Sequence, residues 1–98
     1  MKWRKVSLTR EQILDGTQMQ IVFQATRIFK KAGTPADTAL FISNVPNKDH
    51  GVEMYFSPKA AALSTDLIDK HGGVACDPPA AENVSLSAGR HRFFDPLK

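Results

Sequence analysis

The sequence predicts an α+β domain in which two helices cover one face of an antiparallel sheet. Three observations lead to this prediction. Segments with alternating apolar residues, which are typical of strands, flank two segments with helical periodicity. The loop between the second and third strand segments contains Pro, Asn and Gly, which favours a hairpin. The element order is then β-α-β-β-α-β, the order of a two-layer, ferredoxin-like sandwich.

The first strand and the first helix are expected in the N-terminal third of the chain. Residues 2–8 alternate as a strand, and Thr9 then begins a capping box with Gln12. The helix that follows is expected over residues 10–32, and Gly16 predicts a kink or a broken first turn within it. Its core-facing side is expected to carry apolar residues at three-to-four spacing, namely Leu14, Ile21, Ala25, Ile28, Phe29 and Ala32.

The second half of the chain repeats the pattern. Strands are expected over residues 38–44 and 52–56, and a second helix over residues 58–71. Ser57 is a suitable N-cap for that helix, and Pro58 suits its first position.

The C-terminal region contains two further segments of extended character. Residues 74–76 are expected to be short and extended, and residues 83–88 alternate as a final strand. Residues 89–98 are basic and aromatic, and are expected to form an additional edge strand or a tail. The expected core of the sheet consists of Val6, Leu8, Leu40, Ile42, Val52, Met54, Phe56, Val84 and Leu86.

Length and composition place the chain among small globular domains. Its 98 residues, taken as a single domain over 1–98, have 42% hydrophobic and 23% charged residues and a net charge of +3. This charge is too small to indicate nucleic-acid binding by itself. The single cysteine, Cys76, excludes an intramolecular disulfide, and no apolar segment is long enough to span a membrane, so we expect a cytoplasmic protein.

The side of the sheet away from the helices is the first candidate binding surface. Strand alternation places three aromatic and two charged residues there: Trp3, Lys5, Phe41, Glu53 and Tyr55. Aromatic side chains on an open sheet face are often covered by another protein. The first interpretation is therefore an interaction module that forms a homodimer or binds a protein partner.

Two other interpretations remain open. Aromatic side chains beside basic ones also stack unpaired bases, but residues 50–56 match the RNA-recognition signature poorly and Glu53 would repel phosphate. The third interpretation is a small anionic ligand, or an enzyme site, at the helix that begins with Ser57 and Lys59. The simpler alternative is that Ser57 only starts a helix.

No combination of residues predicts catalysis or a cofactor. Cys76 lies beside Asp77, which disfavours a thiolate, so it is expected to be a small core residue. The three histidines and Cys76 have no metal-ligand spacing, so neither a metal nor a cofactor is expected. Glu53 is the only carboxylate worth testing for catalysis, and it would otherwise pair with Lys5 across two strands.

Overall fold

The computed structural model describes residues 2–33, 41–46 and 51–79, except for the side chains of residues 41–46. Within these ranges, the chain forms four strands and four helices. In order they are β1 (Trp3–Leu8), α1 (Arg10–Leu14), α2 (Thr17–Lys31), β2 (Phe41–Pro46), β3 (Val52–Phe56), α3 (Pro58–Leu63), α4 (Thr65–Lys70) and β4 (Val74–Cys76).

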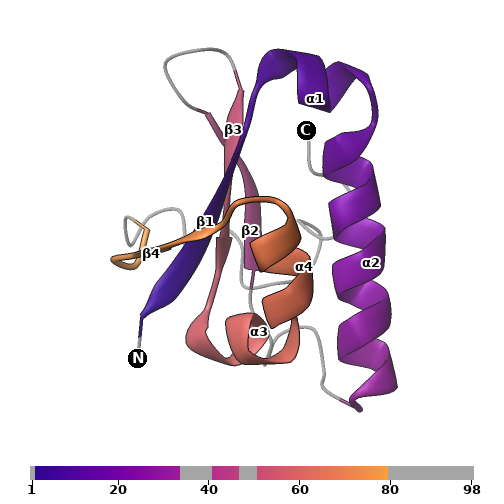
Figure 1. Cartoon of the computed structure of the whole chain (residues 1–98), viewed down its shortest axis with the longest axis vertical. Helices are drawn as coiled ribbons and strands as arrows, with labels where there is room; N and C mark the ends of the chain where they lie inside the picture. Colours follow the sequence, from indigo (N-terminus) through magenta and orange to yellow (C-terminus); the bar gives the residue numbers. More distant parts are fainter. Residues whose placement is uncertain (1, 34–40, 47–50, 80–98) are drawn as a thin grey trace.

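The four strands form one antiparallel sheet in the order β2-β3-β1-β4. The helices stand beside one face of this sheet (Figure 1). The predicted α+β class is therefore confirmed. The pairing of β2 with β3 is irregular between Ile42 and Val45, where the register shifts.

The first predicted helix is divided at Gly16, as its glycine suggested. Gly16 has a φ of 89°, in the left-handed region that favours glycine, and it is the N-cap of α2. The capping box between Thr9 and Gln12 is present at the start of α1. Because the chain changes direction at Gly16, Leu14 does not continue the apolar side of α2 and is 74% exposed, so its expected place in the core was wrong.

The second predicted helix is also divided, at Ser64. The Ser64 hydroxyl donates a hydrogen bond to the Ala60 carbonyl at 2.6 Å, and the Thr65 hydroxyl donates to the Ala61 carbonyl at 2.9 Å. Hydroxyl groups that bond to the preceding turn in this way bend helices. The sequence pattern over residues 58–71 predicted one helix because its apolar periodicity continues across the bend.

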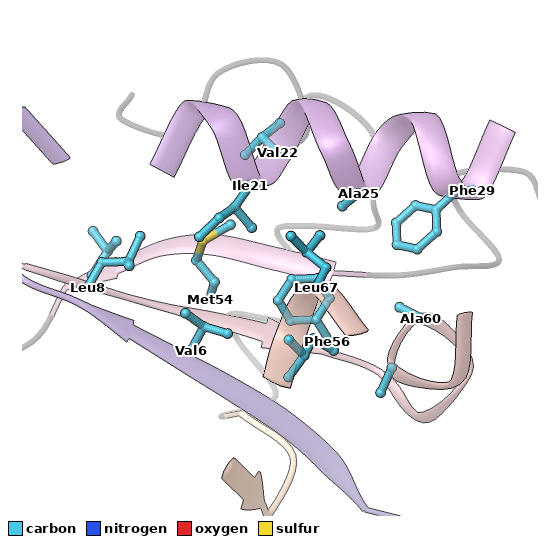
Figure 2. Close-up of a cluster of buried hydrophobic side chains, with 13 residues drawn as sticks. Val6, Leu8, Ile21, Val22, Ala25, Phe29, Met54, Phe56, Ala60 and Leu67 are labelled. Atoms are coloured by element: carbon cyan, nitrogen blue, oxygen red, sulfur yellow. The ribbon is translucent and has the colours of Figure 1, made fainter. Parts of the chain in front are cut away.

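The core lies between the helices and the sheet (Figure 2). Alternate residues of β1 and β3 contribute to it: burial alternates at every residue of β3 and over the last three residues of β1. The buried cluster contains Val6, Leu8, Ile21, Val22, Ala25, Phe29, Val52, Met54, Phe56, Ala60, Ala61, Leu67 and Ile68. Most of the predicted core is thus confirmed; Ala32, however, is exposed because it follows the last turn of α2.

Several predictions lie outside the described residues. These are the strand and tail expected over 83–88 and 89–98, and the core positions Leu40, Ile42, Val84 and Leu86. The segment over 74–76, expected only to be extended, is the strand β4, which pairs with β1.

Gln18 is an exception in the core. Its side chain is fully buried on the inner side of α2, and neither its amide nitrogen nor its amide oxygen has a hydrogen-bond partner among the residues that the structure describes. An unpaired polar group in an apolar interior costs free energy, because it has lost its hydrogen bonds to water.

We therefore expect Gln18→Met, which keeps the shape of the side chain without its amide, to raise the free energy of unfolding by about 1–3 kcal/mol. Urea denaturation with an unchanged m-value measures this. The matched control is Gln20→Met on the exposed side of the same helix, where the change should stay within about 0.5 kcal/mol. Destabilisation by Gln18→Met would mean that the amide makes a hydrogen bond in solution.

Candidate functional site

The candidate surface is the outer face of the sheet, on the side away from the helices. The register pairs Lys5 with Tyr55 and Ser7 with Glu53, and on the other edge of β1 it pairs Lys5 with Val74 and Trp3 with Cys76. Directly paired residues share a face of a sheet. Among the residues whose side chains are described, the outer face therefore includes Trp3, Lys5, Ser7, Glu53, Tyr55, Val74 and Cys76.

The apolar part of the outer face comes from three strands. Trp3 and Tyr55 are half-buried, and Val74 is 54% exposed. Val74 was not among the predicted site residues, because only its pairing with Lys5 places it on the same face as Tyr55, with Lys5 between the two. The structure thus brings together two of the three predicted aromatic residues and adds an aliphatic one.

The charged part of the outer face is an ion pair with a hydroxyl partner. Lys5 Nζ lies 3.6 Å from Glu53 Oε1, and the Ser7 hydroxyl donates a hydrogen bond of 2.7 Å to the same oxygen. The side chain of Glu53 is only 15% exposed. The cross-strand pair that the sequence suggested is present, so the positive charge of Lys5 is balanced on its own face.

The third predicted aromatic residue, Phe41, lies in the segment whose side chains are not described. The backbone register pairs Phe41 with Phe56 and Ile42 with Tyr55. Phe56 belongs to the buried cluster, so the backbone register does not support the expected position of Phe41 on the outer face, which stays a prediction.

The two predicted anion-binding residues lie at the start of α3. The Ser57 hydroxyl accepts a hydrogen bond of 3.2 Å from the Ala60 backbone N–H, and Ser57 is 8% exposed. Lys59 is exposed in the first turn of the same helix. Ser57 therefore caps the helix, and its hydroxyl is already used for that purpose.

Cys76 lies at the edge of the sheet, and its expected role as a core residue was wrong. Val74 and Ala75 are exposed and Cys76 is half-exposed, because β4 is a three-residue strand at the end of the sheet. Burial raises the pKa of the Cys76 thiol and Asp77 raises it further, although Lys5 opposes this shift. The thiol is therefore not activated for nucleophilic attack.

Metal ligation and membrane insertion find no support in the described part of the chain. No group of three or more His, Cys, Asp or Glu side chains there is placed to hold a metal ion. No helix among the described residues is long and apolar enough to cross a membrane.

Comparison with protein-family models, curated proteins and solved structures finds no match to this chain.

The raised pKa of Cys76 leads to a pH-dependent prediction. Only the thiolate reacts with iodoacetamide, so the pH midpoint of alkylation should be higher in the folded protein than in the same protein unfolded in urea. Lys5→Met should move the folded midpoint still higher, because Lys5 favours the thiolate. Cys76 is the only cysteine, so total alkylation reports on it alone. A folded midpoint below the unfolded one would contradict the prediction.

Proposed function

We propose that this protein is a small interaction module that associates with a second copy of itself through the outer face of the sheet. The observation that carries the proposal is the combination, on one face, of the apolar residues Trp3, Tyr55 and Val74 with the balanced pair of Lys5 and Glu53. Contact with water disfavours such a cluster of apolar groups, whereas contact with another apolar surface stabilises it.

A second copy suits this face because the face is complementary to itself. In a twofold dimer the same patch meets its own image, so each group must be compatible with the rotated patch. A rotation about an axis between Lys5 and Glu53 would place each of these charges near its opposite in the partner. Apolar contacts around these charges would exclude water from them.

The alternatives find less support on this face. A single-stranded nucleic acid would need unbalanced positive charge, but Lys5 already lies beside Glu53. A small anion at the start of α3 would need a free hydroxyl, but the Ser57 hydroxyl caps the helix.

We also propose that the fold is of the ferredoxin-like type. Two features support this: the strand order β2-β3-β1-β4, and a β-α-β-β-α-β element order in which α1 with α2, and α3 with α4, each count as one divided helix. We propose a reducing compartment such as the cytoplasm, since the one cysteine has no second cysteine in the chain to pair with.

Self-association through the outer face predicts that Tyr55→Ala raises the dimer dissociation constant by about tenfold or more, as expected for a central aromatic residue of an interface. Sedimentation velocity over a concentration series measures this constant. The matched control is Phe23→Ala, which removes an aromatic residue that is 59% exposed in the helical layer. This control should leave association unchanged.

Two outcomes would overturn the proposal. One is a wild-type protein that stays monomeric at the highest concentration reached. The other is a dimer that Tyr55→Ala and Phe23→Ala affect equally. Circular dichroism of each variant establishes that it remains folded.

A further inference from the structure

Helix α2 has an unusual charge composition for an exposed helix. Its fifteen residues include three cations, Arg27, Lys30 and Lys31, and no Asp or Glu. All three cations are exposed. Exposed helices commonly carry acidic residues one turn away from basic ones, because such pairs stabilise the helix.

These cations also differ from those on the sheet. Lys2, Arg4 and Lys5 each lie within 4 Å of a carboxylate, those of Asp77, Asp69 and Glu53. Across the described ranges, no cation of α2 takes part in an ion pair. The C-terminal half of α2 is therefore a site of unbalanced positive charge.

An exposed aromatic side chain lies on the same side of α2. Phe23 is 59% exposed, and it precedes Arg27 by four residues and Lys30 by seven, spacings that place the three on one side of a helix. The opposite side of α2 is fixed by the buried residues Ile21, Ala25 and Phe29, which point toward the core (Figure 2). We call Phe23, Arg27, Lys30 and Lys31 the α2 outer surface.

A fourth cation adds to the charge at this end of the molecule. Helix α3, which carries Lys59 in its first turn, lies at the end of the molecule where α2 ends (Figure 1). Lys59 is in the first turn of its helix, where a positive charge is opposed by the helix dipole. The helix dipole therefore accounts for the positive charges of Lys30 and Lys31 at the end of α2. It does not account for the positive charge of Lys59 at the start of α3.

We propose that the α2 outer surface binds single-stranded nucleic acid. Arg27, Lys30 and Lys31 would contact successive phosphates, and Phe23 would stack on a base. The surface spans nine residues from Phe23 to Lys31, or about 12 Å of helix, which corresponds to a few nucleotides. This site is separate from the outer face of the sheet, so it does not depend on self-association.

The chemistry favours a nucleic acid over an anionic membrane. A helix that lies in a membrane surface inserts its apolar side among the lipids. The apolar side of α2 is buried in the core and cannot do so. One aromatic residue among cations offers a stacking platform rather than a lipid anchor.

The test measures binding of short labelled oligothymidylate and oligouridylate by fluorescence anisotropy, from low to physiological salt. Contacts with three or four phosphates predict that log K falls with log salt with a slope of about −2 to −3, since each contact with a single strand contributes about −0.7. The double variant Lys30→Gln/Lys31→Gln should reduce the slope by about 1.4. Phe23→Ala should weaken binding by about fivefold or more at every salt concentration.

Two control variants locate the site. Arg10→Gln removes an exposed cation at the start of α1, at the opposite end of the molecule (Figure 1), and should leave the slope unchanged. Tyr55→Ala alters the outer face of the sheet and should leave oligonucleotide affinity unchanged.

The proposal would be overturned if neither oligonucleotide bound at low salt. It would also be overturned if Arg10→Gln changed the slope of log K against log salt as much as Lys30→Gln/Lys31→Gln does. Loss of binding in Tyr55→Ala would also overturn it, because the strand would then lie on the sheet. Binding to vesicles of anionic lipid, without binding to either oligonucleotide, would overturn the proposal as well. Equal affinity for the two oligonucleotides, or preference for one of them, is compatible with the proposal, since stacking and phosphate contacts are common to both.

Discussion

The burial of one side of α2 against the sheet is the contact on which the two proposed surfaces depend. Ile21, Ala25 and Phe29 belong to a single buried cluster with Val6, Met54 and Phe56 of β1 and β3. Ala25 is completely buried, and its small side chain allows the helix to lie close to the strands. Because a helix repeats every 3.6 residues, burial of these residues also places Phe23 and Arg27 on the outside.

The same contact determines the outer face of the sheet. Residues of a strand alternate between the two faces, so that burial of Val6 and Met54 places Lys5 and Tyr55 on the other side. A shift of the register by one residue would exchange the two sets and bury a lysine. The two proposed surfaces are therefore on opposite sides of the molecule. Each is determined by the residues that are buried in the core, because their burial leaves the remaining residues of the same helix or strand on the outside.

Local signals in the sequence were enough to locate most of the elements. The strand over Val52–Phe56 and the capping box at Thr9 depend only on neighbouring residues, and both were predicted correctly. The break at Gly16 could also be anticipated, because a left-handed backbone is unfavourable for other residues.

Features that depend on distant parts of the chain could not be predicted from these signals. Cys76 is half-exposed because β4 is an edge strand of the sheet. The three residues of β4 do not by themselves indicate where in the sheet the strand lies. Arg4 lies on the same side of β1 as the buried residues Val6 and Leu8. Its guanidinium donates hydrogen bonds to the Asp69 carboxylate at 2.7 Å and to the Gly73 carbonyl at 2.8 Å. That partnership exists only because the end of α4 returns to β1. Within the candidate site, the pairing of Lys5 with Glu53 was foreseeable from strand alternation, but the addition of Val74 needed the register of β4.

The break at Gly16 has a consequence for how the protein moves. It separates α1, which contains no buried residue, from α2, which contains five. The five residues of α1 are held by the capping box at Thr9 and by the turn at Asp15, whose carboxylate accepts hydrogen bonds from Thr17. Unfolding of α1 alone would remove the partly buried Ile13 from the core and leave the buried cluster in place, so its cost in free energy is small compared with that of global unfolding. The core thus fixes α2 and the sheet, whereas α1 depends mainly on local hydrogen bonds and is the helix expected to unfold first.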